Sequence, residues 1–414
     1  MAQKKILLVC RSFWLEKNRI NDICYGFCER GCQVDVLCGQ PVNSEGSFLK
    51  GYGHFTTRVQ KHRGINIFRT IDVKRPAGAH AGLFLNYLVF PLAGWIKAGS
   101  LAEKKYDAVF VYQASPVMMA AAGLRAAKKR NIPLTILVKE IWPLKAYELL
   151  SVQSPAFSSF LYKLSMYYYK RAGRLITESP EDEKYLRDRF LETADRIEML
   201  VPGPLKVYEE AEADDDLLDK FAGSFNITLV SDGMADFSAG VIAAAAKEVV
   251  RSHIFGIRFI ILGKSFSVGE LKKEVRDRDL EDFFFFEGDV KSADLKKYLY
   301  VSDALLYSEN AGNETGRSNI GQIINYMAAS KAVIAAAHGN VRSIIRAAGC
   351  GYCSETKDAA SLGANIIRMY KMDKNELRQL GCNARAYQLR HYNRDSYIDR
   401  ILDIMTDSGC GEDL

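Results

Sequence analysis

The order of apolar and helical patterns at the start of the chain constrains the fold more than any other feature. Residues 5–10 are a continuous apolar run of the kind found in buried parallel strands. Apolar residues then recur at helical spacing over residues 20–30, and Gly31 follows where helices commonly end. Residues 34–38 form a second apolar run. Two parallel strands joined by a helix make a right-handed βαβ unit, which predicts a doubly wound sheet.

This pattern continues to about residue 200 and then starts again. An acidic stretch after Pro202-Gly203-Pro204 separates the two halves, and 414 residues suffice for two domains. We therefore predict α/β domains at residues 1–203 and 204–385, and a C-terminal helical segment, 386–414, that crosses back to the first domain. The predicted strands are residues 65–69, 108–112, 134–138, 175–178, 226–230, 258–262, 283–286, 304–307 and 332–336. The predicted helices are residues 117–130, 239–250, 292–301, 321–329 and 385–405.

Composition and charge exclude several classes of protein. With 48% hydrophobic and 26% charged residues, the chain is neither disordered nor fibrous. The first apolar run is too short for a signal peptide, and no stretch is apolar enough to span a membrane, so we expect a cytoplasmic protein with reduced thiols. Residues 1–200 carry 30 Lys and Arg against 18 Asp and Glu. This excess predicts a polyanionic partner, but the basic residues are too scattered for nucleic acid.

The most informative segment for function is residues 309–336. A glycine-containing loop precedes a helix that begins near Ile320, and the free N–H groups at the start of such a helix suit a phosphate. Arg317 in this loop, and Lys264 directly after Gly263, would add positive charge for a diphosphate. The alternative is an ordinary crossover with a polar loop.

Several segments, in order along nearly the whole chain, resemble family-4 glycosyltransferases of the GT-B fold. Residues 326–335 (YMAASKAVIA) resemble the family's YMAAGKPVIA, and residues 140–143 (EIWP) resemble the D-x-WP motif of members that build bacterial surface polysaccharides. The other matching segments are residues 4–10, 30–37, 115–116, 171–179 and 287–303. The resemblance implies an α/β architecture of two Rossmann-like, doubly wound domains facing across a cleft, and a retaining glycosyltransferase.

The resemblance also implies the substrates and the site residues. The donor would be a nucleotide-diphosphate sugar, of the UDP or GDP type, transferred as a hexosyl or N-acetylhexosaminyl group with no obligatory cofactor or metal. Positive charge and N–H donors would stabilise the diphosphate leaving group, while Glu140 would orient or deprotonate the acceptor hydroxyl. The expected catalytic residues are Glu140, Lys264 and Arg317. The expected donor-binding residues are Gly233, Gly263, Glu309, Gly316, Ser318, Asn319 and Asn325, and Arg11 and Trp142 are expected on the acceptor side.

Two of these residues also have simpler interpretations that involve no ligand. Glu309, expected to contact the sugar, could be a solvated loop acid. Glu140, which follows a predicted strand, could be a surface acid near Lys139 and Lys145.

The acceptor is predicted from a basic run next to an aromatic segment. Basic residues are frequent over residues 58–75, and residues 83–95 are rich in Leu, Phe, Tyr and Trp. This combination suits a polyprenyl-phosphate-linked saccharide at an anionic bilayer, and predicts a protein peripheral to the inner face of the cell membrane. The alternative is a solvated face beside a core helix.

The chain departs from the family at the donor motif. Asn325 and Arg317 stand where the family has two glutamates, and residues 231–240 lack the usual basic pair. These departures support a second hypothesis, a catalytically silent homologue that binds and stabilises an active partner glycosyltransferase. A third hypothesis is a sugar-nucleotide epimerase of the same fold.

Overall fold

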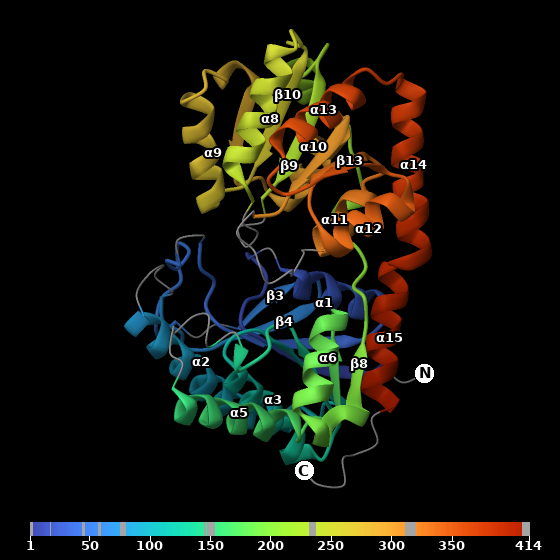
Figure 1. Cartoon of the computed structure of the whole chain (residues 1–414). Helices are drawn as coiled ribbons and strands as arrows, with labels where there is room; N and C mark the ends of the chain where they lie inside the picture. The colour runs from blue at the N-terminus through green and yellow to red at the C-terminus, as the bar shows by residue number, and fades with distance from the viewer. Residues whose placement is uncertain are drawn as a thin grey trace. The chain divides into compact units, whose positions relative to one another are not determined.

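The computed structural model describes residues 3–16, 18–43, 46–56, 59–74, 80–144, 146, 154–231, 237–310 and 320–407 (Figure 1), with backbone alone for residues 80–86 and 292. The chain forms two compact units. The first comprises Met1–Val201 together with Asp395–Leu414, and the second comprises Pro202–Arg394. Each unit is built on a doubly wound sheet, which confirms the predicted fold class.

The first unit has a sheet in the strand order β3-β4-β2-β1-β5-β6-β7-β8. The neighbours pair in parallel except β3 and β4, which are antiparallel. The chain winds outward from β1 in one direction through β2 and from β5 in the other, so the topological switch lies between β1 and β5. The strands are β1 (Lys5–Cys10), β2 (Gln33–Cys38), β3 (Val59–His62), β4 (Ile65–Arg69), β5 (Ala108–Gln113), β6 (Leu134–Val138), β7 (Arg174–Thr177) and β8 (Ile197–Met199).

Helices cover both faces of this sheet, and alternate residues of each strand face opposite cores. Leu7 and Val9 of β1 join one hydrophobic cluster, whereas Ile6 and Leu8 join another. The two-sided burial explains why the strands are continuous apolar runs. The helices of this unit are α1 (Arg19–Glu29), α2 (His80–Leu101), α3 (Ala120–Arg130), α5 (Pro155–Tyr169), α6 (Pro180–Arg189) and α15 (Arg394–Asp407).

The second unit has an all-parallel sheet in the order β11-β10-β9-β12-β13-β14. Its switch point lies between β9 and β12. The strands are β9 (Phe225–Val230), β10 (Ile257–Leu262), β11 (Phe284–Gly288), β12 (Ala304–Ser308), β13 (Ala332–Ala336) and β14 (Gly351–Ser354). The helices are α7 (Asp215–Lys220), α8 (Ala239–Arg251), α9 (Phe266–Arg276), α10 (Ser292–Val301), α11 (Ile320–Ala328), α12 (Gly339–Ala348), α13 (Ala359–Tyr370) and α14 (Lys374–His391).

The C-terminal helix belongs to the first unit. The prediction of one helix over residues 385–405 is wrong, because α14 ends at His391 and α15 begins at Arg394. Apolar residues of α15, including Ile398, join the core next to α1. A Cβ at Gly26 of α1 would lie 2.3 Å from Ile398 Cδ1, so the absence of a side chain there allows the close approach.

Polar contacts reinforce this docking at the end of β7. Tyr397 of α15 donates a hydrogen bond to the Glu178 carboxylate (2.7 Å), and Lys139 Nζ lies 2.8 Å from the same group. Burial alone raises the pKa of Glu178, but the positive charges of Lys139 and Arg19 outweigh burial and hold that pKa below its ordinary value. The ionised carboxylate therefore stabilises the position of α15.

Shortening Ile398 tests the contribution of α15 to the first unit. Because Ile398 is fully buried, we expect Ile398→Ala to lower the free energy of unfolding by about 2–4 kcal/mol. The matched control is Ile96→Ala, the same change at a side chain that is 61% exposed, with an expected effect within about 0.5 kcal/mol. Equal effects in urea denaturation would contradict the packing described for α15.

The Glu178 contact predicts a pH-dependent loss of stability. A carboxylate whose pKa is lower in the folded state stabilises the protein above its unfolded pKa and loses that effect as pH falls through the folded pKa. Glu178→Gln should therefore cost about 1–3 kcal/mol at pH 7, since Lys139 is half-exposed and partly screened. The difference from wild type should shrink below about pH 4. Glu192→Gln, at a surface pair with Lys170, is the control, and a Glu178→Gln effect that is independent of pH would rule out this account.

Candidate functional site

The carboxyl edge of the sheet in the second unit gathers polar residues from several strands. Ser231 follows β9, Gly263 follows β10, Glu309 follows β12 and His338 lies two residues after β13. Because the strands are parallel, their carboxyl ends share one edge, and ligands of doubly wound sheets bind there, at the switch point. Five predicted donor-site residues lie outside the described residues: Gly233, Gly316, Arg317, Ser318 and Asn319.

The turn after β10 depends on a glycine. Gly263 has a φ of +106°, and a Cβ at this position would lie 2.0 Å from the Ser231 carbonyl oxygen. Its N–H donates to the Gly288 carbonyl (2.6 Å), so the ends of β9, β10 and β11 are held closely together. Lys264 follows on this turn with an exposed side chain. The geometry thus presents a cation at the edge of the sheet.

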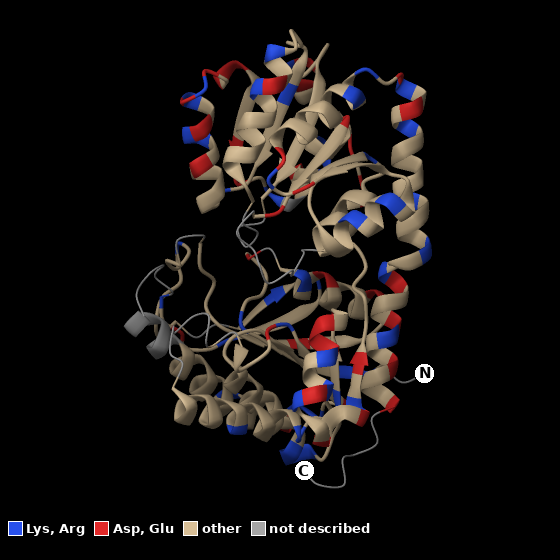
Figure 2. Ribbon diagram, viewed as in Figure 1, with Lys and Arg blue, Asp and Glu red and all other residues tan. Residues whose placement is uncertain are grey.

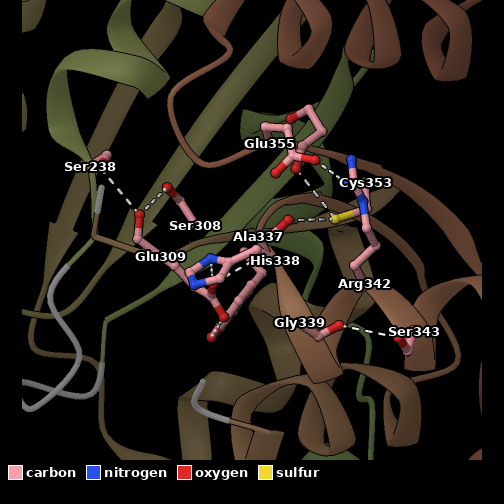
Figure 3. A network of polar contacts seen from close by, with 12 residues as sticks. Ser238, Ser308, Glu309, Ala337, His338, Gly339, Arg342, Ser343, Cys353 and Glu355 are labelled. Carbon is pink, nitrogen blue, oxygen red and sulfur yellow. Dashed lines mark hydrogen bonds and ion pairs between the residues drawn. The ribbon is translucent and has the colours of Figure 1, made fainter. Parts of the chain in front are cut away.

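Glu309 is buried, with 5% of its surface exposed, so the alternative of a solvated loop acid is wrong. Its Oε1 accepts a hydrogen bond from the Tyr307 hydroxyl (3.2 Å), and its Oε2 accepts one from the His338 backbone N–H (3.2 Å). The His338 Nδ1 lies 2.8 Å from the same Oε2 (Figure 3). The Ser238 hydroxyl, just before α8, donates to the Glu309 carbonyl (3.1 Å). Glu309 therefore links the segments that follow β9, β12 and β13.

Asn325 lies on the buried side of α11. Its Oδ1 accepts a hydrogen bond from the Leu205 N–H (2.8 Å), and only 5% of the residue is exposed. The neighbouring Tyr326 hydroxyl accepts from the Val230 N–H (3.0 Å) and donates to the Leu306 carbonyl (3.2 Å). These contacts fix α11 at the switch between β9 and β12.

The first unit places Glu140 and Trp142 at the carboxyl edge of its own sheet. The Ser115 hydroxyl donates to the Glu140 carboxylate, and the Trp142 Nε1 donates to the Ser115 oxygen (3.1 Å). The Gln113 side chain donates to the Glu140 carbonyl (3.0 Å) and accepts from the Tyr169 hydroxyl (3.0 Å). Trp142 is 2% exposed. The Trp142 ring is therefore too buried to contact a ligand directly, and it is linked to Glu140 through Ser115.

Arg11, at the end of β1, is also buried. Its Nη2 lies 3.1 Å from Asp72 Oδ1, and its guanidinium lies 5.2 Å from the centre of the Phe90 ring. Gly39 leaves room for this pair, because a Cβ there would lie 2.4 Å from Asp72 Oδ2. Asp72 thus balances the positive charge of Arg11 within this pair.

Sequence reasoning missed two features of these edges. His338 and its contact with Glu309 were not predicted, nor was the group formed by Lys139, Glu178 and Tyr397. A signal for His338 was available, since it closely follows a predicted strand. The pairing with Glu309, 29 residues earlier, has no sequence signature.

The described residues contain neither a metal-binding group nor a membrane-spanning helix. No three His, Cys, Asp or Glu side chains in this part of the chain gather as they would around a metal ion. Over the same residues, no helix combines the length and the apolar character needed to cross a bilayer.

The chain matches two models of protein families. Residues 17–203 match the glycosyl transferase 4-like domain, and residues 241–387 match the glycosyl transferases group 1. No curated protein sequence matches the chain.

Solved structures of glycosyltransferases share the fold over almost the whole chain. HepE from Anabaena, solved with UDP and glucose, has 16% identity and a TM-score of 0.65, covering 98% of this chain and 100% of that one. Sucrose-phosphate synthase from Thermosynechococcus elongatus has 16% identity and a TM-score of 0.68, covering 97% and 98%. WaaG, a glycosyltransferase of lipopolysaccharide biosynthesis, has 12% identity and a TM-score of 0.65, covering 97% and 100%.

Two family models that match successive parts of the chain, and two doubly wound units, lead to one conclusion: the chain belongs to the family-4, group 1 glycosyltransferases of the GT-B fold.

Proposed function

We propose that the protein transfers a sugar, with retention of configuration, from a nucleotide-sugar donor to a lipid-linked or polysaccharide-precursor acceptor in bacterial cell-surface glycan synthesis. Binding of the donor is supported by one observation above all: at the edge of the second sheet, the tight turn at Gly263 leaves the Lys264 side chain exposed. HepE, which shares the fold, was solved with UDP and glucose. WaaG, which also shares it, acts in lipopolysaccharide biosynthesis.

The donor site that we propose lies at the carboxyl edge of the second sheet. The diphosphate gains negative charge as the glycosidic bond breaks, and a preorganised cation stabilises that charge. Lys264 would supply this cation, and Gly263 lets the backbone approach closely. We also propose that Arg317 and the N–H groups of residues 316–319 bind the diphosphate, and that Gly233 belongs to the donor site. Asn325, whose Oδ1 pairs with Leu205, would support the position of α11.

The acceptor site that we propose uses the edge of the first sheet. Glu140 is half-buried and held by Ser115, and a positioned carboxylate can orient or deprotonate an attacking hydroxyl. Arg11 would position this edge through its pair with Asp72, and Trp142 through Ser115.

An exposed apolar surface supports membrane association. We call it the α2–α5 face; its exposed side chains are Leu88, Leu92, Trp95 and Ile96 of α2, and Phe160 and Tyr167 of α5. The described part of α2 is uncharged along almost its whole length (Figure 2). A groove of about 440 Å³ opens on this face, lined by Trp95, Ala121, Leu124, Arg125, Lys128, Lys129, Tyr167 and Tyr168. Apolar side chains next to cations suit an anionic bilayer.

Cations of α3 add to those that the sequence suggested for the acceptor side. Arg69, in the basic run 58–75, is 1% exposed and donates to Gln60 and to the Gly39 and Trp14 carbonyls. Arg58 and Arg75 lie outside the described residues. Lys61, Arg63 and Lys74 of the same run are exposed. On α3, next to α2, the Arg125 guanidinium lies 3.7 Å from the centre of the Trp95 ring and adds positive charge. The protein would thus lie on the inner face of the cell membrane.

Titration with nucleotides tests the donor site. We expect one of a panel of UDP-, GDP- and TDP-sugars to stabilise the protein in a thermal shift assay, and Lys264→Ala to weaken its binding about 10-fold or more, because a charge-assisted hydrogen bond is lost. Lys273→Ala, which removes an exposed charge on α9, should leave affinity unchanged. Equal affinity in both variants would exclude Lys264. Failure of every nucleotide to bind wild type would favour the silent-partner hypothesis.

Vesicle binding tests the α2–α5 face. Wild type should cosediment with vesicles that contain phosphatidylglycerol, and the double variant Leu92→Glu, Ile96→Glu should bind them at least about 10-fold more weakly, because apolar contact is replaced by repulsion. Phe266→Glu alters a side chain that is 77% exposed on α9 and serves as the control. Unchanged cosedimentation of the double variant would refute the membrane proposal.

A further inference from the structure

The pair formed by Glu309 and His338 has a geometry that suits ligand recognition. Glu309 is a predicted donor-site residue, whereas His338 belongs to no site predicted from the sequence. Both residues sit at the carboxyl edge of the second sheet, just after the adjacent strands β12 and β13. Glu309 is buried, whereas the His338 side chain is 40% exposed. The pair therefore connects the interior of the unit to its surface, and Figure 3 shows the imidazole next to the carboxylate.

The carboxylate of Glu309 is committed to protein partners. Oε1 accepts from the Tyr307 hydroxyl, and Oε2 accepts from the His338 backbone N–H. A carboxylate that is 5% exposed and already paired is poorly placed to bind a sugar directly. Its influence on a ligand must pass through the imidazole of His338, whose Nδ1 is 2.8 Å from Oε2, close enough for a hydrogen bond although not in line with one.

The exposed edge of the imidazole carries the other nitrogen. Nδ1 has almost no accessible surface, although the side chain as a whole is 40% exposed. The accessible part is therefore the opposite edge, which includes Nε2. A carboxylate next to Nδ1 favours the tautomer with its proton on Nδ1, which leaves the lone pair of Nε2 facing outward as an acceptor.

We propose that His338, positioned by Glu309, recognises a hydroxyl group of the nucleotide sugar by accepting its hydrogen bond at Nε2. This inference rests on the proposed function, because it places the donor at this edge. Hydroxyl groups are present on the ribosyl ring and on the glycosyl ring of such a donor, and either ring presents the same chemistry. Glu309 is a positioning residue in this account, and His338 is the residue that touches the ligand.

The test uses calorimetric titration of the full chain with UDP-glucose, UDP, GDP-mannose and GDP. For the sugar nucleotide that wild type binds, His338→Ala should raise Kd about 3- to 10-fold, the effect of one lost hydrogen bond. A loss for the sugar nucleotide alone identifies a glycosyl hydroxyl, and an equal loss for the bare diphosphate identifies a ribosyl hydroxyl. His338→Gln keeps an acceptor and should restore part of the affinity.

Glu309→Gln distinguishes positioning from mere structural support. The His338 backbone N–H keeps the amide oxygen at the position of Oε2, but the amide is neutral, so it favours the proton on Nδ1 less strongly and leaves Nε2 a weaker acceptor. We expect this variant to lose as much affinity as His338→Ala, and the double variant to lose no more than either single variant. Thermal unfolding of each variant checks that the fold is retained, and Tyr307→Phe, which removes only the contact to Oε1, should bind more tightly than Glu309→Gln.

The outcomes separate this inference from the function on which it rests. Binding by wild type, with unchanged affinity in His338→Ala, overturns the inference and leaves the proposed function standing. Additive losses in the double variant overturn the positioning role of Glu309. Absence of binding by wild type to all four nucleotides overturns the proposed donor and the inference with it.

Discussion

The burial of the Glu309 carboxylate is the constraint on which the proposed donor site depends. A buried carboxylate is costly unless its oxygens are paired, and here the partners come from different segments: Tyr307 on β12 and His338 after β13. The Glu309 carbonyl in turn accepts from Ser238, before α8. One residue thus joins the segments that flank the switch point. The same pairing leaves the imidazole of His338 partly exposed at the edge of the sheet. The contact that satisfies the buried carboxylate therefore also orients the side chain that we propose to bind the ligand.

The carboxyl edges of the two sheets carry different residues and suit different ligand groups. In the second unit, a glycine turn at Gly263 lets backbone segments approach and leaves Lys264 exposed, an arrangement suited to a diphosphate. In the first unit, the charge of Arg11 is balanced by Asp72, and Glu140 is held by Ser115, an arrangement suited to an uncharged hydroxyl. The residues at the two edges thus agree with a donor on the second unit and an acceptor on the first, as the proposed function requires.

The sequence was sufficient to predict the fold because the strands buried on both faces are continuous apolar runs. It failed where distant packing decides the local structure. Helical spacing continues through residues 385–405, yet these residues join two cores, and the helix breaks after His391. No strand is predicted after residue 336, yet β14 starts at Gly351, where a Cβ would lie 1.8 Å from the Val333 carbonyl oxygen. Glu309 could be selected as a strand-end acid, whereas its pairing with His338 depends on strand order.

A crystal structure of the protein with the nucleotide sugar that binds it tests the central claim most directly. The account predicts density for the diphosphate next to Gly263 and Lys264, with a ligand hydroxyl within about 3 Å of His338 Nε2. A nucleotide bound away from the carboxyl edge of the second sheet, or an imidazole that faces solvent beside a bound ligand, would contradict it.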